Sequence, residues 1–426
     1  MLTLTMKRVL VALAIVLGAC SGGGENNDAA PSANATPVPV ATLTFEERLA
    51  FPAGQVENPI QMLIHPVETV ALRLSDVLVQ EFSVRRARLS PDATLADDLG
   101  LDDLTALSPV LLRDFGVALV PADTEALTTL ADLVTFVQSG LGDQLEETIA
   151  ARSSLYVDVL LIDEASEALN GLCESGTGLA SAPWLDGLAY AAAMAQNCGQ
   201  PALQVASARL PVAALFPTLT DETPEATAEA TADSAPEATP EPLPEVDPDD
   251  LRTGEAVVLF STTPLTSITS LADRVFCRLN SQDVSSWFVP LLLMEQVGLD
   301  PLRAPAEIRD VATADALVAA VAEGECEVAA LPEGAFSSAP RADGVSTVTT
   351  TTPFPFGVLV YPLEVQLGVR LSLNENLIAI AADPAAGRPL RLLLGADALL
   401  PAAPDDFAEM TGFIAASGYD LAQLGN

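Results

Sequence analysis

Short apolar runs alternate with amphipathic segments along two stretches of the chain, and this alternation predicts strands followed by helices. The predicted strands are 59–64, 155–162, 178–182, 203–208, 256–260, 275–279, 327–331 and 356–361. The predicted helices are 164–173, 187–196, 285–297 and 314–322, with mostly helical sequence after 361. Short apolar strands between helices are typical of parallel sheets that are covered on both faces, so the pattern predicts an α/β fold.

Residues 67–140 break this alternation and read as all-helical. Helices are expected at 70–81, 104–115 and 130–139, joined by polar loops. A strand precedes this region, and the first helix that covers the sheet, 144–151, follows it. The order predicts a helical domain inserted in a surface loop, where insertions are tolerated.

Two low-complexity stretches separate the patterned parts. The first, 21–45, is small and polar, and the second, 217–250, repeats Pro, Glu, Ala and Thr. Neither has enough large apolar residues to bury a core, so both are expected to be extended linkers without fixed structure.

The first twenty residues read as a secretion signal. Lys7 and Arg8 precede an apolar run, 9–17, that is too short to span a bilayer as a mature helix. The run ends in Leu17-Gly18-Ala19-Cys20, which resembles the lipobox of bacterial lipoproteins. The resemblance implies a lipid on Cys20 and an extracytoplasmic protein anchored to the cell membrane. An ordinary signal peptide with a chance cysteine is the alternative.

Composition limits the classes of function that the protein can have. The net charge of −39 argues against nucleic acid as a partner and against charge-driven docking on an anionic membrane surface. The only lysine is Lys7, so the mature chain has no lysine for a Schiff base or a phosphate loop. His65 is the only histidine, and no Gly-x-Ser-x-Gly, zinc or Walker motif appears. These features predict a protein that is not an enzyme and that has no cofactor and no metal site.

Besides Cys20, the chain has an even number of cysteines, which suggests disulfides in an exported protein: Cys173, Cys198, Cys277 and Cys326. Three pairings remain open. The pairing of Cys173 with Cys198 and of Cys277 with Cys326 is favoured, because it keeps each bridge within one half of the chain.

The α/β stretches resemble the phosphate/phosphonate-type substrate-binding proteins of ABC transporters. Five segments carry the resemblance by their order and spacing: 57–60, 184–191, 275–299, 324–330 and 353–362. The resemblance implies a type II periplasmic-binding-protein-like fold, in which two lobes close on a small ligand at the carboxyl ends of their strands. It also implies a phosphate or phosphonate held by serine hydroxyls and helix N-terminal amides, and an ABC permease as a partner.

The sequence departs from that family in its anion-binding loop. Ser285 matches the second serine of the family's loop, but Asp283 replaces the first serine and Ser286 replaces a glycine. Glu68 adds a carboxylate to the opening loop, 65–69. A carboxylate repels a phosphate, so a cationic ligand, a polar neutral ligand or no ligand becomes the alternative to an oxyanion.

The candidate ligand-binding residues follow from the same resemblance: His65, Glu68, Thr69, Trp184, Tyr190, Asp283, Ser285, Ser286 and Trp287. Structural alternatives stay open for several of them. Asp283 also suits the N-cap of the next helix, the two tryptophans suit core packing, and His65 suits a structural role.

The helical insert resembles an acyl carrier protein through residues 90–104, 115–119 and 127–132. Carrier proteins bear phosphopantetheine on the serine of an Asp-Ser-Leu triplet, where this chain has Asp102-Asp103-Leu104. Because Asp103 has no hydroxyl, the resemblance implies a carrier-like bundle without its prosthetic group. A helical bundle with chance similarity is the alternative.

The predicted parts are a signal peptide (1–20), a tether (21–45), lobe 1 (46–66 and 141–216), the insert (67–140), an acidic linker (217–250), lobe 2 (251–350) and a return crossing with C-terminal helices (351–426). The resulting hypothesis is a lipid-anchored solute-binding protein of an ABC-type system. The alternative is a ligand-free adaptor or sensor lipoprotein that uses the insert as a protein-docking surface.

Overall fold

The computed structural model describes residues 60–153, 155–173, 180–208, 250–265, 267–340 and 345–421. The signal peptide, Cys20, the tether and the acidic linker up to residue 249 lie outside the described residues. The predictions for them therefore stay predictions.

The first sheet has the strand order β13-β4-β12-β3-β1-β2. Its strands are β1 (Ile60–Ile64), β2 (Val157–Leu161), β3 (Ala180–Leu185), β4 (Gly199–Ala206), β12 (Val358–Pro362) and β13 (Ala398–Pro401). β1 lies parallel between β2 and β3, whereas β12 is antiparallel to β3 and β4. The predicted α/β fold is confirmed, but the sheet is mixed and not parallel throughout, because β12 enters from the second sheet and not through a covering helix.

The second sheet is separate and has the order β10-β6-β9-β7-β8. Its strands are β6 (Val257–Ser261), β7 (Val275–Arg278), β8 (Glu307–Asp310), β9 (Val328–Pro332) and β10 (Ser346–Thr350). An antiparallel pair, β5 (Gly254–Glu255) with β11 (Phe354–Pro355), lies where the chain passes between the sheets. The sequence pattern missed β8, β10 and β13, which have few fully buried residues.

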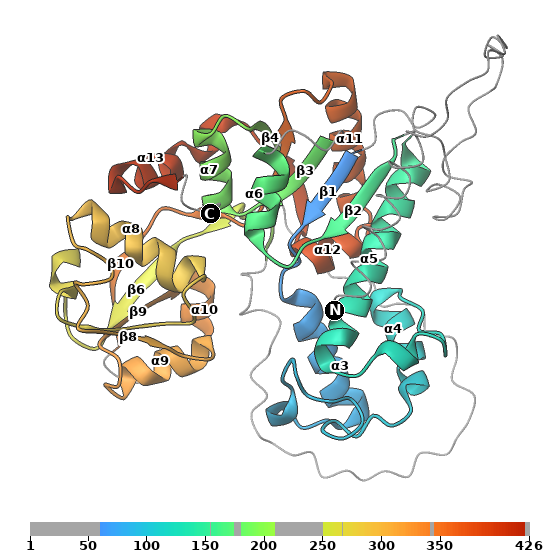
Figure 1. Cartoon of the computed structure of the whole chain (residues 1–426), viewed down its shortest axis with the longest axis horizontal. Helices are drawn as coiled ribbons and strands as arrows, with labels where there is room; N and C mark the ends of the chain where they lie inside the picture. Colours follow the sequence, from blue (N-terminus) through green and yellow to red (C-terminus); the bar gives the residue numbers. More distant parts are fainter. Residues whose placement is uncertain are drawn as a thin grey trace, which may run out of the picture. The chain divides into compact units, whose positions relative to one another are not determined.

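Helices cover the sheets (Figure 1). On the chain around the first sheet these are α6 (Ala165–Cys173), α7 (Gly187–Ala195), α11 (Leu367–Ala382) and α12 (Arg388–Leu394). Around the second sheet they are α8 (Val289–Gln296), α9 (Ala314–Ala322) and α10 (Glu333–Ser338), with a π-helical turn, Val284–Phe288, leading into α8. A last helix, α13 (Ala408–Ser417), follows a 3-10 turn at Pro404–Phe407.

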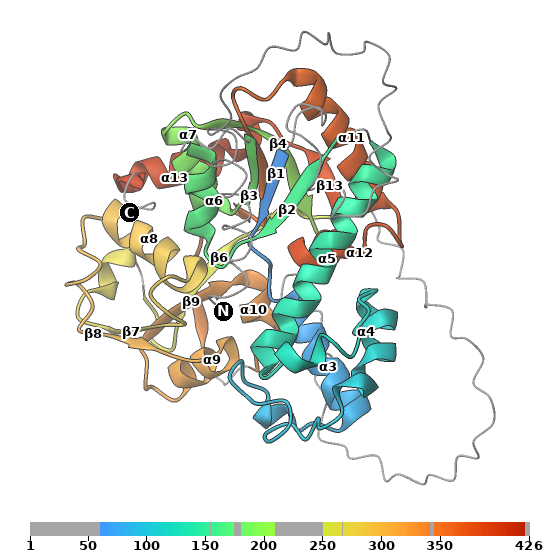
Figure 2. The ribbon, with the colours of Figure 1, turned by 45° about the vertical axis from the view of Figure 1, so that its right-hand side comes forward.

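The insert contains α3 (Thr69–Phe82), α4 (Ser108–Phe115) and the first half of α5 (Leu130–Arg152), with 3-10 turns at Arg86–Arg88, Leu104–Leu107 and Thr124–Ala126. The predicted helix 104–115 is thus a 3-10 turn followed by a short α-helix. The predicted helices 130–139 and 144–151 are one continuous helix, which runs from the insert to the first sheet in both views (Figures 1 and 2).

Gly140, in the first half of α5, is closely packed against the insert. A Cβ at Gly140 would lie 2.8 Å from Cγ1 of Val117, so glycine allows a close approach of the insert's loop to the helix. The helix begins with a capping box, in which Thr129 and Asp132 bond each other's backbone amides.

No helix among the described residues has the length and apolar character that a membrane crossing requires.

The described residues form three apolar cores. One face of the first sheet shares a continuous core with the insert, including Ile64, Leu78 and Leu141. The opposite face of the first sheet shares a core with one face of the second sheet and with α13. The other face of the second sheet packs on α9 and α10 in a core of its own.

Candidate functional site

The carboxyl ends of β1, β2 and β3 meet at one edge of the first sheet, since these strands are parallel. His65 follows β1 and is exposed, and its Nε2 lies 3.1 Å from the backbone carbonyl oxygen of Asp163, which follows β2. Asp186 follows β3 and is close enough to His65 for the two to interact electrostatically. This edge therefore collects polar groups from three strands.

Asp186 caps α7. One carboxylate oxygen, Oδ1, accepts hydrogen bonds from the backbone N–H groups of Leu188 and Ala189, both at 2.8 Å. Burial raises the pKa of Asp186 above its usual range, although the two amide hydrogen bonds and His65 act in the opposite direction. The sequence analysis did not select Asp186 as a site residue, although an aspartate between a predicted strand and a predicted helix indicates an N-cap.

Glu68 and Thr69 lie at the start of α3, beside this edge. Glu68 is exposed at the N-cap position, and its side chain makes no capping hydrogen bond. Thr69, the first residue of α3, is partly buried. The amides at this helix end are therefore not occupied by the side chain of the N-cap residue.

The second sheet presents the loop after β7. Oδ1 of Asp283 accepts a hydrogen bond from the backbone N–H of Ser286 at 2.5 Å, so this carboxylate caps the helical turn. The hydroxyl of Ser286 accepts from the N–H of Leu279 at 2.9 Å and is fully buried, which is a structural role. Ser285 is partly exposed, so its side chain, unlike that of Ser286, reaches solvent.

Trp287 is 4% exposed and packs in the core. Its ring lies edge-on to Phe276 at 5.9 Å, and the guanidinium of Arg278 lies 4.5 Å from its centroid. Nε of Arg278 also donates to Oδ1 of Asp310 at 2.7 Å. Arg278 thus brings a cation to the carboxyl end of β7, and sequence reasoning did not select it.

Glu255 is a buried carboxylate on crossing strand β5. It accepts a hydrogen bond from the backbone N–H of Gly334, at the start of α10. Burial raises the pKa of Glu255, and the nearby Glu333 acts in the same direction. The N-termini of α7, of the turn before α8, and of α10 therefore each carry a carboxylate of the chain itself.

The two aromatic candidates of the first sheet lie in different cores. Trp184 is 5% exposed within the core shared with the insert, and among the described residues its buried Nε1 has no hydrogen-bond partner. Tyr190 is buried in the core shared with the second sheet, with its ring 4.4 Å from that of Phe407. Burial raises the pKa of Tyr190 to about 12. The structure does not bring these two side chains together.

In the insert, Asp103 caps the turn Leu104–Leu107. Its Oδ1 accepts from the backbone N–H of Thr105 at 3.0 Å and from the Thr105 hydroxyl at 2.5 Å.

A surface hollow of about 460 Å³ lies elsewhere on the insert, lined by Arg88, Ser90, Asp92, Ala93, Asp97 and Asp98. Within the described residues, no group of three or more His, Cys, Asp or Glu side chains could hold a metal ion.

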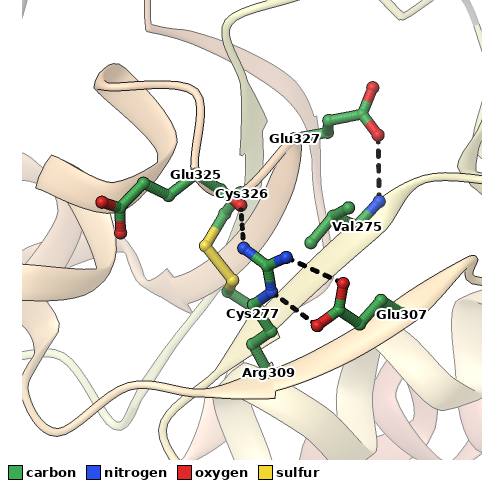
Figure 3. Close-up of a disulfide and its surroundings, with 7 residues drawn as sticks. All are labelled: Val275, Cys277, Glu307, Arg309, Glu325, Cys326 and Glu327. Carbon is green, nitrogen blue, oxygen red and sulfur yellow. Dashed lines mark hydrogen bonds and ion pairs between the residues drawn. A yellow bond between two sulfur atoms is a disulfide. The ribbon is translucent and has the colours of Figure 1, made fainter.

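Both favoured disulfides form. Cys173 is bonded to Cys198, and Cys277 to Cys326. The second bridge joins β7 to the segment just before β9, and both of its cysteines are buried. Figure 3 shows Arg309 beside it, donating to both carboxylate oxygens of Glu307 at 2.8 Å and to the carbonyl oxygen of Glu325 at 2.8 Å.

Comparison with known proteins finds two kinds of relative. Residues 241–407 match the family model described as ABC transporter, phosphonate, periplasmic substrate-binding protein. A separate segment of 77 residues is 31% identical to an acyl carrier protein of Solidesulfovibrio magneticus, covering 18% of this chain and 99% of the carrier protein.

Solved structures that are similar to this chain include the following two. A Xanthomonas citri protein with bound chloride is 15% identical with a TM-score of 0.45, over 65% of this chain and 90% of the other. A binding protein component of an ABC phosphonate transporter from Pseudomonas aeruginosa is 13% identical with a TM-score of 0.38, over 67% of this chain and 91% of the other.

Proposed function

We propose that this chain, which combines a phosphonate-type periplasmic substrate-binding domain of ABC transporters with a segment of the acyl carrier protein family, is a lipid-anchored solute-binding protein. The family match at residues 241–407 supports the binding role and a permease as partner. The N-terminal sequence that ends at Cys20 supports export and anchoring.

The observation that carries the binding role is the presence of two separate sheets with a short antiparallel pair at the crossing. In such a fold a ligand would lie at the carboxyl ends of the strands, between the sheets. On the first sheet the proposed contacts are His65, Glu68 and Thr69. On the second sheet they are Asp283 and Ser285.

The ligand that fits these contacts is polar and either neutral or cationic. Asp186, Asp283 and Glu255 already occupy helix N-terminal amides that an oxyanion would use. Asp310 pairs with Arg278, the cation nearest to the loop after β7. A phosphate or phosphonate would have to approach these carboxylates, which disfavours it.

Thermal-shift measurements on the full chain test the proposal. A ligand that binds only the native state raises the melting temperature, so a panel of phosphate, simple phosphonates, neutral polar solutes and amines should give a shift with the last two classes. Replacing Asp283→Asn keeps an N-cap oxygen but removes the charge. The variant should weaken the shift from a cationic ligand. An oxyanion would instead bind the variant more tightly.

Asp315→Asn is the matched control. Asp315 is exposed in the first turn of α9, so the substitution makes the same charge change away from the proposed contacts. It should leave every ligand-induced shift unchanged. If no compound of any class raises the melting temperature, the binding role fails and the adaptor role takes its place.

The adaptor role is the second candidate, and the observation that favours it is the cap formed by Asp103. Asp103 stands at the phosphopantetheine position, where its carboxylate caps a 3-10 turn and offers no hydroxyl for the prosthetic group, so a role other than the carrier reaction is proposed for this segment. Mass spectrometry of the exported chain should find no phosphopantetheine, and should find an N-terminal peptide that begins with a lipid-modified Cys20. A Cys20→Ala variant should leave the membrane fraction.

A further inference from the structure

The C-terminal helix α13 contacts parts of the chain that belong to both sheets. After β13, at the outer edge of the first sheet, the chain turns at Pro404–Phe407 and forms α13. This helix packs on α8 and on α7, and in Figures 1 and 2 it lies close to both. Phe407, Met410 and Ile414 are buried at helical spacing, so one face of the segment is apolar and covered.

The contacts with the first sheet's helix are close. The ring of Phe407 lies 4.4 Å from that of Tyr190 on α7. A Cβ on Gly187, the first residue of α7, would lie 2.9 Å from Sδ of Met410 and 3.0 Å from Cδ1 of Phe354. Gly187 therefore permits an approach that a larger residue would prevent.

The contacts with the second sheet use different residues of α13. Nε2 of Gln296, at the end of α8, donates to the carbonyl oxygen of Phe413 at 2.7 Å. The ring of Phe413 lies edge-on to that of Phe354 at 5.9 Å. Phe354 is on β11, one of the two crossing strands, so α13 touches both sides of the crossing and the crossing itself.

We propose that the segment 404–417 is a clasp that fixes the angle between the two sheets. The crossing pair β5 and β11 has only two residues in each strand, too few to set an angle alone. Rotation of one sheet against the other must separate α13 from α7 or from α8. If the chain binds a ligand between its sheets, as proposed above, the clasp would set how readily the sheets close.

Spin-label distance measurements test the clasp without any ligand. Labels on introduced cysteines at Gln196, at the end of α7, and Ala319, on α9, report the separation of the two sheets, and both positions are exposed. The double variant Gln296→Ala and Phe413→Ala removes the hydrogen bond between α8 and α13 and the ring contact of Phe413 with Phe354, and leaves the contacts of Phe407 and Met410 with α7 in place. It should broaden the distribution of distances relative to the parent chain.

Gly412→Ala is the control on the same helix. Gly412 is exposed, and a Cβ there would meet nothing within 4 Å, so the variant should strengthen the helix and leave the distance distribution narrow. The single variant Gln296→Ala, which removes one hydrogen bond, should broaden the distribution less than the double variant and serves if the double variant does not fold.

An unchanged distribution in folded variants would overturn the clasp. A broad distribution already present in the parent chain would overturn it as well. Because no ligand enters the measurement, failure of the binding role in thermal-shift assays and failure of the clasp are separate results.

Discussion

The first sheet has two neighbours, the helical insert and the second sheet, and it is joined to them differently. The insert shares one continuous helix, α5, and one continuous core with the first sheet. The second sheet is joined through short crossing strands and through side-chain contacts made by α13. Both junctions bury apolar surface, but only the first has an unbroken helix through it.

Polar contacts also hold the insert and α5 to the helices of the first sheet. Arg388 on α12 donates from Nη1 to the carbonyl oxygen of Arg113 in the insert at 3.2 Å, and Arg152 at the end of α5 pairs with Asp383 at 2.6 Å. A continuous helix resists bending because bending breaks backbone hydrogen bonds, whereas side-chain contacts can slide. We therefore expect the insert to move with the first sheet and the second sheet to move against it.

The largest effect should come from breaking α5 between the insert and the sheet. Gly142→Pro removes a helical hydrogen bond and introduces a clash, at a cost of about 3 kcal/mol or more. Chemical denaturation should show a lower midpoint and a broad or split transition, because the insert and the first sheet would no longer unfold together.

Gly142→Ala is the matched control for that helix. A Cβ at Gly142 would lie 3.7 Å from Cγ1 of Val159, an ordinary contact, so alanine should stabilise the chain by roughly 0.5–1 kcal/mol. A proline variant that unfolds in one transition at the parent's midpoint would contradict the shared-helix interpretation.

A loss of stability of similar size is expected within the second sheet, at its buried disulfide. Cys277 and Cys326 are separated by 49 residues, and removing a bridge that closes a loop of this size costs about 4 kcal/mol in the chain-entropy model. The double variant Cys277→Ser and Cys326→Ser should lower the denaturation midpoint markedly. Arg309→Ala, an exposed change beside the bridge, should lower it little. If the two variants lost equal stability, the disulfide would not be the main stabilising contact in this part of the second sheet.

The smallest effect concerns pH and the edge of the first sheet. Because burial raises the pKa of Asp186, the native state holds this proton more tightly than the unfolded state. Its contribution to stability is therefore most favourable below the unfolded pKa and falls as the pH rises through the folded pKa. Asp186→Asn should thus gain stability relative to the parent as the pH increases from acid to neutral. A constant difference across that range would show that the carboxylate is not destabilised by burial.

Much of the α/β part could be predicted from local pattern. The helix Ala314–Ala322 lies where the sequence predicts it. The predicted strand 275–279 is one residue longer than β7, and the predicted strand 327–331 is shifted by one residue from β9. The two favoured disulfides also formed. The edge strands β8 and β10 escaped prediction because their exposed, polar residues carry little of the apolar signal that identifies a strand.

The residues of the candidate site were harder to predict from local sequence pattern than the strands and helices were. Asp186, Glu255 and Arg278 gain their importance from neighbours that are distant in sequence or hidden by burial. Gly334, which donates to Glu255, is 79 residues away along the chain. Residue type alone could place a carboxylate near a helix start, but could not tell which amides it would occupy.

By itself, the sequence determined the alternation of strands and helices and the carrier-like helical segment without a phosphopantetheine serine. It also determined the acidic, lysine-poor character of the chain. Periodicity and residue chemistry are local properties, so both can be read from the sequence. Tertiary structure alone decided that two predicted helices are one, that β12 runs antiparallel, and that the last helix packs against helices of both sheets. These features depend on which apolar faces meet after the chain has folded, and a linear pattern does not contain that choice.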